Sequence, residues 1–302
     1  MSPSRREVLA GLAAAGALTA APRLARAATP HPAYPIIHAG CSAITWSDNA
    51  EKAIADIAAA GFSGIQLRAP TLQQYPDPHA LRDLLAQHKL TFVALSSGIT
   101  SLDPAQRQAT LDEHVKHAQY MQRAGGMYLQ LISAWAKPGQ TFTTADCKLQ
   151  GEIFTEIGKR IADYGIKLGF HNHMNSIGQP PEAIDAILQA SDPRYVFLEL
   201  DTAHYVQGGG DPVKAIHQYA RRILFMHFKD VKNAPTKSGY EFVELGQGRL
   251  DFPAIVAALG AIRFNGWGIV ELDRVPAGDT RTPQQANALS LHYLRETLGV
   301  RG

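Results

Sequence analysis

Cysteine, charge and long apolar runs are all scarce in this sequence. Only 2 of the 302 residues are cysteine, 19% are charged, and the formal net charge is +2. The two cysteines, Cys41 and Cys147, could pair in an oxidising compartment. Nothing near them in the sequence brings them together, so we favour two buried free thiols. No stretch reaches the ~18 apolar residues of a transmembrane helix, so we expect the mature protein not to span a membrane.

Apolar residues are plentiful, at 45% of the chain. That share can bury a full core, which excludes the disordered, collagen-like and coiled-coil classes. The positive charge is concentrated in residues 1–27, where four arginines stand against Glu7 alone, so the rest of the chain is close to neutral. A near-neutral body lacks the basic surface that nucleic acid or an anionic membrane requires. This argues against a DNA-repair function and against a nucleic-acid partner.

Residues 1–27 have the pattern of an export signal. Paired arginines precede a weakly apolar run over residues 9–21, and small residues stand at −3 and −1 of a cleavage site after Ala27. A run of about 13 residues is too short to span a bilayer as a helix. The pattern predicts a twin-arginine signal and a mature domain over residues 28–302 in the periplasm.

Eight short apolar, β-rich runs recur along the mature chain, with helical stretches between them. The runs begin near His38, Gly64, Leu90, Tyr128, Ile166, Phe197, Ile223 and Trp267. Their spacing of about 25 to 45 residues is that of a βα unit, and their nearly continuous apolar character is typical of parallel strands covered by helices. Helix starts are marked by an N-cap residue before proline, at Asp77–Pro78, Asp103–Pro104, Asp211–Pro212 and Thr282–Pro283. The pattern predicts an α/β fold, a single (β/α)8 TIM barrel. The alternative, a doubly wound sheet, lacks its glycine-rich turn after the first strand.

Polar side chains gather where the last four strands of this barrel end, which is where barrel enzymes carry their chemistry. These residues are His171, His173, Glu199, Asp201, His204, His227, Lys229, Glu271 and Asp273. Side chains alternate along a strand, so residues two apart share a face. Imidazole and carboxylate without thiolate suit Mn²⁺, Co²⁺, Mg²⁺ or Zn²⁺. A buried charged cluster without a metal or pairing would be costly. Export of an already folded protein favours Mn²⁺, since copper and zinc in the periplasm outcompete manganese for most N/O sites.

These strand ends resemble those of the xylose isomerase-like TIM-barrel superfamily, which includes sugar isomerases and epimerases, inosose dehydratases and the endonuclease IV group. The matching stretches are KLGFHNHM, LELDTAHYVQGGGDP, RILFMHFKDV, LGQGRLDFPAI and GWGIVELDR. The sugar phosphate isomerase/epimerase and inosose dehydratase branches are the most similar, over essentially the whole mature chain. The resemblance implies a divalent metal held by Asp201, His227 and Glu271, with a fourth ligand at the end of the fifth strand.

The fourth ligand is where this sequence departs from the pattern. The family usually has a glutamate there, and this sequence has His171. In the epimerases that glutamate is also one of two opposed acid/base groups, the other being the equivalent of Glu271. A His171 ligand would keep the metal but change the charge and basicity of that face, which counts against two-carboxylate epimerisation. The imidazole-x-imidazole ending recurs in the dehydratase-like branch and favours a different chemistry.

The chemistry expected of such a site is enolisation next to a carbonyl. A metal that polarises the carbonyl makes the neighbouring proton removable. We expect the catalytic residues to be Glu271, His173 and Lys229, where a lysine base would need a lowered pKa.

Other residues are candidates for substrate contact, each with a structural alternative. His204 and Arg274 would bind or protonate a departing oxygen, and Gln66 and Gln130 would hydrogen-bond the substrate. Three aromatic residues could stack on a sugar face or lie in the core, namely Trp46, Trp135 and Tyr205.

We therefore expect a divalent-metal-dependent sugar isomerase or epimerase that acts on a ketose, keto-sugar or cyclitol, with homo-oligomerisation left open. The first alternative is a metal-dependent lyase, either an inosose-type dehydratase or an enzyme that cleaves 3-keto-glycosides. The second is a noncatalytic periplasmic sugar-binding protein. A nuclease is disfavoured because the first four strand ends lack the histidines and acids of a trinuclear site. A phosphorylated substrate is disfavoured because no basic pocket is evident.

Overall fold

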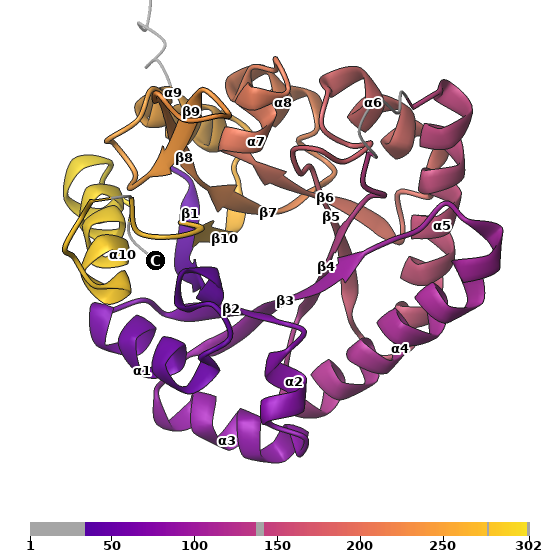
Figure 1. Ribbon diagram of the computed structural model, residues 1–302, viewed down its shortest axis with the longest axis horizontal. Coiled ribbons are helices and arrows are strands. Elements are labelled where there is room, and N and C mark those ends of the chain that lie inside the picture. Colours follow the sequence, from indigo (N-terminus) through magenta and orange to yellow (C-terminus); the bar gives the residue numbers. More distant parts are fainter. Residues whose placement is uncertain (1–33, 137–141, 277, 301–302) are drawn as a thin grey trace, which may run out of the picture. The chain divides into compact units, whose positions relative to one another are not determined.

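Eight parallel strands pair side by side and close into a barrel in the computed structural model, which describes residues 34–136, 142–276 and 278–300 (Figure 1). Around the barrel the order is β1, β10, β7, β6, β5, β4, β3 and β2. The bounds are Ile36–Ser42 (β1), Gly64–Arg68 (β2), Thr91–Ile99 (β3), Tyr128–Ile132 (β4), Lys167–His171 (β5), Val196–Asp201 (β6), Ile223–Phe228 (β7) and Asn265–Val270 (β10). The predicted (β/α)8 TIM barrel is confirmed, and each strand starts within two residues of its expected position.

Helices follow the strands and ring the barrel (Figure 1). The α-helices are Ala50–Ala60 (α1), Thr71–Gln74 (α2), Pro78–Gln87 (α3), Arg107–Ala124 (α4), Thr144–Ala162 (α5), Pro181–Ala190 (α6), Thr202–Gln207 (α7), Pro212–Gln218 (α8), Phe252–Ala261 (α9) and Pro283–His292 (α10). Three further helical turns are Ala43–Trp46 (η1), Pro104–Gln106 (η2) and Tyr293–Thr297 (η3). The expected caps are present: the side chains of Asp77, Asp211 and Thr282 accept hydrogen bonds from the backbone at the starts of α3, α8 and α10.

An apolar layer lies next to the polar strand ends. Val93, Phe225 and Ile269 belong to a small fully buried cluster contributed by β3, β7 and β10. Phe225 precedes His227 by two residues and so shares its face of β7, and the two ring centroids are 6.1 Å apart. The polar residues at the strand ends therefore lie on a packed apolar base, away from water.

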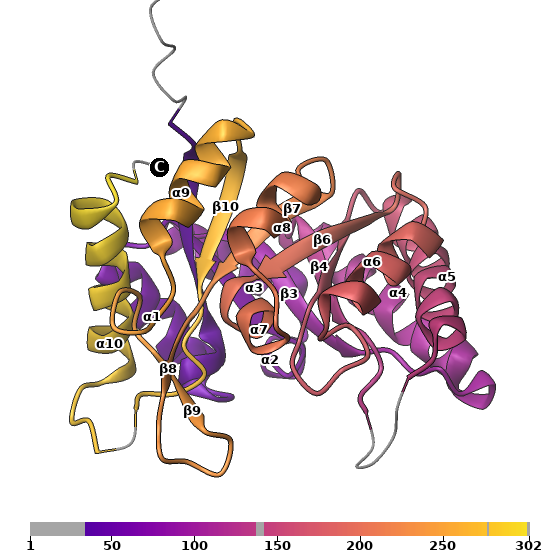
Figure 2. The same ribbon diagram turned by 90° about the horizontal axis from the view of Figure 1, so that it is seen from above.

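A hairpin that the sequence did not predict follows β7. Strand β8 (Asp230–Asn233) pairs antiparallel with β9 (Tyr240–Val243), and Figure 2 shows this pair projecting at the end of the barrel toward which β10 points. The side chain of Asp230, the first residue of β8, fixes the segment behind the hairpin. Its two oxygens accept hydrogen bonds from the backbone N–H groups of Val231 (2.8 Å), Gly246 (3.0 Å), Gly248 (2.9 Å) and Leu250 (3.3 Å). A Cβ on Gly248 would stand 2.1 Å from the carboxylate of Asp230, so glycine is required there.

The predicted export signal lies outside the described residues, so cleavage after Ala27 and a periplasmic location stay predictions. In the described part of the chain, no helix has both the length and the apolar character needed to cross a bilayer. Cys41 and Cys147 are both buried and unpaired, as expected.

The contacts of Asp230 lead to a stability prediction. Asp230→Ala leaves four backbone N–H groups without their acceptor, and we expect the free energy of unfolding to fall by about 3 kcal/mol. The control is Asp211→Ala, which removes an exposed helix cap at α8 and should lower it by about 1 kcal/mol. Urea denaturation of the two variants and the parent measures both values. A loss in D230A no larger than that in D211A would contradict the role given to Asp230.

Candidate functional site

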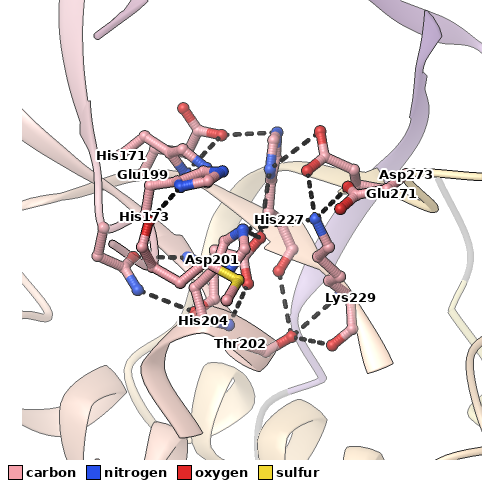
Figure 3. Close-up of polar contacts among 12 residues, drawn as sticks. His171, His173, Glu199, Asp201, Thr202, His204, His227, Lys229, Glu271 and Asp273 are labelled. Atoms are coloured by element: carbon pink, nitrogen blue, oxygen red, sulfur yellow. Dashed lines mark hydrogen bonds and ion pairs between the residues drawn. The ribbon is translucent and has the colours of Figure 1, made fainter. Parts of the chain in front are cut away.

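The polar ends of β5, β6, β7 and β10 converge on one buried cluster (Figure 3). The side chains of Glu199, Asp201, His227 and Lys229 are 0% exposed, those of His171 and His204 1%, and that of Glu271 6%. All but His204, which lies in α7, stand at the last residues of a strand or just after it, and alternate positions along each strand direct them to the same side. The sequence therefore brings three imidazoles, three carboxylates and an ammonium group into a space that excludes water.

His227 lies at the centre of this cluster. Its Nε2 is 2.6 Å from Oε1 of Glu199 and 2.7 Å from Oε1 of Gln66. Both partners are acceptors, so Nε2 carries a proton and donates it. The other ring nitrogen, Nδ1, lies 3.6 Å from Oδ2 of Asp201 and 3.5 Å from Oε2 of Glu271. Nδ1 thus faces two carboxylate oxygens, an arrangement that requires either a proton on Nδ1 or a cation in the space between them.

The charges of the cluster shift the pKa values of its members strongly. Burial raises the pKa of Glu199 to about 7, against the opposing effect of His227. Burial acts to lower the pKa of His227, but the carboxylates of Glu199 and Glu271 outweigh it and hold that pKa well above the usual range. The pKa of Glu271 is held well below its usual range by His227 and Lys229, although burial acts to raise it. The protein without a cation therefore keeps a proton on His227.

Several buried polar atoms of the cluster have no hydrogen-bond partner among the described residues. They are Nδ1 of His171, Nδ1 of His204, Nδ1 of His227, Oδ2 of Asp201 and Oε2 of Glu199. Unpartnered buried atoms of this kind are rare in proteins and often mark an ion site. Ligand atoms of His171, Asp201, His204 and Glu271 all lie within 4.8 Å of one another. Separations of 3.5–3.6 Å between Nδ1 of His227 and two carboxylate oxygens also suit ligands that each lie ~2.0–2.2 Å from a shared ion. The donor set fits a divalent cation held by nitrogen and oxygen.

The set of possible ligands is wider than expected from the sequence. The structure brings together all four expected ligands, His171, Asp201, His227 and Glu271, and adds His204 beside them. Asp201 has a divided role: its Oδ1 accepts a hydrogen bond from the backbone N–H of His204 at 2.7 Å and caps α7, which leaves Oδ2 directed at His227.

Lys229 differs from the expectation of a base with a lowered pKa. Its Nζ lies 2.9 Å from Glu271 and 2.5 Å from Asp273, and 4.3 Å from the ring centroid of Phe242 in β9. Burial acts to lower the pKa of Lys229, but Asp273 and Glu271 raise it well above the usual range. Lys229 is therefore a fixed cation in this state and lacks the lowered pKa that a lysine base would need, so its catalytic role stays a prediction.

The rings of His173 and His204 pack against each other, with centroids 4.2 Å apart and planes tilted by 45°. Burial, and then the charge of Lys229, lower the pKa of both imidazoles, so both are neutral. Nδ1 of His173 is 2.7 Å from the carbonyl oxygen of Met174 and must donate to it, which leaves the lone pair on Nε2. Nζ of Lys229 is 3.4 Å from Nε2 of His204, which places the proton of that ring on Nδ1.

The remaining predicted contacts divide between the cluster and the surface. Oε1 of Gln66 accepts a hydrogen bond from Nε2 of His227, and Nε2 of Gln130 donates one to Glu199 at 3.4 Å. Both glutamines therefore contact residues of the cluster. Arg274 is exposed after β10, and no hydrogen bond or ion pair joins it to the cluster within the described ranges. Of the three aromatics, Trp46 and Tyr205 are buried in the core, whereas Trp135 is 39% exposed and its ring lies 5.0 Å from that of His173.

Sequence reasoning gave Glu199 no role in the site and missed two further residues, Asn172 and Thr202. Glu199 shares a face with Asp201, which the alternation signalled, but its role as partner of His227 follows only from the pairing of β6 with β7. Asn172 and Thr202 are fully buried beside the ligating residues. Both lie within matching motifs of the sequence, but neither carries a charge that would have attracted notice.

Comparison with known proteins places the chain among barrels of this kind. A family model described as Xylose isomerase-like TIM barrel matches residues 54–296. An inosose dehydratase of Clostridium beijerinckii is 25% identical over 275 residues, which cover 82% of this chain and 90% of that protein. An inosose dehydratase of Klebsiella pneumoniae is 27% identical over 280 residues, covering 83% of this chain and 90% of that protein.

Solved structures share the fold at lower identity. The IOLI protein with a binding zinc atom is 19% identical, with a TM-score of 0.75 over 87% of this chain and 98% of that one. A probable 3-DHS dehydratase, AsbF of Bacillus anthracis, is 14% identical with a TM-score of 0.71 over 85% and 98% of the two chains. D-allulose 3-epimerase of Methylomonas sp. in complex with D-allulose is 21% identical, with a TM-score of 0.69 over 87% and 98%.

The contacts of His227 lead to a prediction about its protonation. Glu199→Gln keeps the side-chain shape and removes one of the three carboxylates that raise the pKa of His227, so that pKa should fall. NMR titration of the imidazole in metal-free protein measures the change. The control is Glu244→Gln, which alters a buried carboxylate that pairs with Arg281 outside the cluster and should leave His227 unchanged. An E199Q protein whose His227 titrates like that of the parent would contradict the assignment.

Proposed function

We propose that this chain, which belongs to the xylose isomerase-like TIM barrel family, is a divalent-metal-dependent lyase that removes water from an uncharged keto-cyclitol or keto-sugar. The sequence alone placed isomerisation or epimerisation first and the lyase second. The dehydratase relatives, which cover most of the chain, and the imidazole of His171 in place of a carboxylate support the reverse order.

One observation carries the metal part of the proposal, namely that the buried Nδ1 of His227 faces carboxylate oxygens of Asp201 and Glu271 at 3.6 and 3.5 Å without a hydrogen-bond partner among the described residues. We assign His171, Asp201, His227 and Glu271 as ligands, with His204 as the alternative nitrogen. A divalent cation there would supply electrostatic stabilisation for negative charge that develops on the substrate carbonyl oxygen. The donor set suits Mn²⁺, Co²⁺ and Zn²⁺.

His173 is suited to remove the proton next to the carbonyl. Its lowered pKa keeps the ring neutral, and its bond to Met174 leaves the lone pair of Nε2 available. A base must already be unprotonated when it acts, and the neutral ring of His173 meets that condition. Glu271 is less suited, since it is already engaged by Lys229 and His227.

His204 and Lys229 are suited to the second half of the reaction, in which the β-hydroxyl leaves as water. Nδ1–H of His204 has no partner among the described residues and can give its proton to the departing oxygen. Nε2 of the same ring accepts a hydrogen bond from the Lys229 ammonium group, 3.4 Å away, which stabilises the negative charge left on the ring until the proton taken by His173 returns to it. The substrate thus loses one proton to His173 and its hydroxyl gains one from His204, which balances the loss of one water.

The charges at the site support an uncharged substrate. Lys229, the buried cation of the cluster, is already paired with Glu271 and Asp273, so a phosphate or carboxylate group would meet carboxylates at the strand ends. Hydroxyl groups of a cyclitol or sugar can hydrogen-bond the same carboxylates and imidazoles without that repulsion. The exposed ring of Trp135 beside His173 offers an apolar face for such a ring.

The proposal predicts a bound metal and a dehydrated product. Elemental analysis of protein folded in the cytoplasm should find about one divalent metal per chain. Incubation in D₂O with inososes, ketoses and 3-keto-glucosides should give solvent exchange at the carbon next to the carbonyl and an unsaturated ketone. Treatment with a chelator should abolish both, and added Mn²⁺ or Co²⁺ should restore them.

Other results would redirect the proposal. A stereoisomer or positional isomer as product would return the epimerase or isomerase to first place. Metal without exchange on any of these compounds would favour the noncatalytic binding protein. A chain that binds no metal would overturn the site itself.

The assigned roles predict that two histidine variants separate the two halves of the reaction. His173→Gln should lose deuterium exchange and dehydration together, by about 10²- to 10⁴-fold. His204→Gln should keep much of the exchange and lose dehydration, because only the departure of the hydroxyl lacks its acid. His217→Gln, on the exposed side of α8, serves as the control, and the metal content of each variant is measured alongside. Equal loss of both steps in H204Q with its metal retained would contradict the division.

A further inference from the structure

The ligating residues stand at or beyond the points where the barrel's own hydrogen-bond ladders end. Between β5 and β6 the last paired residues are His171 and Glu199. Between β6 and β7 they are Asp201 and His227. Asp201 therefore lies two residues past the last pairing of its strand with β5, and Lys229 lies two residues past the last pairing of β7 with β6.

Asn172 continues the pairing of β5 with β6 through its side chain. Its Nδ2 donates to the carbonyl oxygen of Asp201 at 3.1 Å, and its Oδ1 accepts from the N–H of Asp201 at 2.8 Å. The amide thus binds both backbone groups of a single residue, as a neighbouring strand would. Asn172 is 0% exposed, and both polar atoms of its amide are engaged by the backbone of Asp201.

Thr202 does the same between β6 and β7. Its hydroxyl donates to the carbonyl oxygen of Lys229 at 2.7 Å and accepts from the N–H of Lys229 at 3.1 Å, as Figure 3 shows. Thr202 is also 0% exposed. Asn172 and Thr202 therefore fasten three consecutive strand ends in series. Asn172 makes two hydrogen bonds to the backbone of Asp201, and Thr202 makes two to Lys229 and one of 3.2 Å to the carbonyl oxygen of His227.

We propose that Asn172 and Thr202 are positioning residues of the metal centre, which set the relative height of His171, Asp201, His227 and Lys229 along the barrel axis. This inference rests on the metal-dependent function proposed above. Without the two side chains, the backbone of Asp201 would lose its hydrogen bonds to β5 and that of Lys229 its hydrogen bonds to the end of β6, while the carboxylates of Asp201 and Glu271 repel each other in a buried site. Outer groups that orient ligands in this way typically change metal affinity by 10- to 100-fold when removed.

The alternative is that the two residues only stabilise the fold, so the test needs a matched control. Thr155 provides it. Its hydroxyl donates to the carbonyl oxygen of Gly151 at 2.9 Å and accepts from the N–H of Asp192 at 2.9 Å. Thr155 lies on α5, so the bonds link a helix to the segment before β6 and involve no residue of the cluster.

The experiment measures binding of Co²⁺ and Mn²⁺ by calorimetry in metal-free protein, together with the visible absorption of the Co²⁺ form, which reports ligand geometry. The variants are Asn172→Ala, Thr202→Val, Thr202→Ser and Thr155→Val. Thermal unfolding of each metal-free protein is recorded separately. We expect the dissociation constants to rise 10- to 100-fold in N172A and T202V, with an altered Co²⁺ spectrum. T202S, which keeps the hydroxyl, and T155V should bind like the parent.

Two results would overturn this inference alone. One is a dissociation constant within about twofold of the parent value in folded N172A and T202V, against the 10-fold minimum expected. The other is a T155V variant that loses as much affinity as T202V, which would make the effect one of general loosening. If N172A does not fold, the comparison of the dissociation constants of T202V and T202S tests the inference. A parent chain that binds neither ion would overturn the metal centre and this inference with it.

Discussion

Burial of like charges at the ends of four strands is the constraint on which the rest of this structure depends. Glu199, Asp201 and Glu271 are all buried. The repulsion between their carboxylates is strong where water is excluded. His227 bridges all three, with one nitrogen on Glu199 and the other facing Asp201 and Glu271. The cluster is held together by a proton on this ring or by a cation that replaces it.

Residues around the cluster offset the repulsion between its carboxylates. Lys229 neutralises the side of the cluster nearest β10 through Glu271 and Asp273, and the ring of Phe242 covers its ammonium group. Phe242 reaches that position because the β8–β9 hairpin rises directly after Lys229, and Asp230 holds the segment behind it by four backbone hydrogen bonds. The end of β7 at residues 227–230, the β8–β9 hairpin and residues 246–250 are thus joined into one unit beside the site.

The fold and the position of the site could be predicted from the sequence because they depend on local patterns. Apolar runs such as those of β5 and β7, and caps such as Asp211, are properties of neighbouring residues, and alternation along a strand places His171 with His173 and Glu199 with Asp201. The partners within the site could not be predicted in the same way. Gln66 bonds a histidine 161 positions away, and that contact depends on the register of strands that meet only when the barrel closes.

Charge states were the least accessible from the sequence, since they depend on the sum of all neighbours. A lysine among carboxylates and imidazoles could have had its pKa lowered by burial or raised by its partners, and the residue types alone do not decide. The distances decide, because Lys229 lies within 2.9 Å of two carboxylates. In the function we propose, that result favours His173 for the basic role, because its pKa is lowered and its bond to Met174 leaves the lone pair on Nε2. The proposed division of labour between a neutral imidazole base and a buried ammonium group rests on this geometry, and a site that separates the two is suited to elimination, in which a proton and a hydroxyl must leave from different carbons.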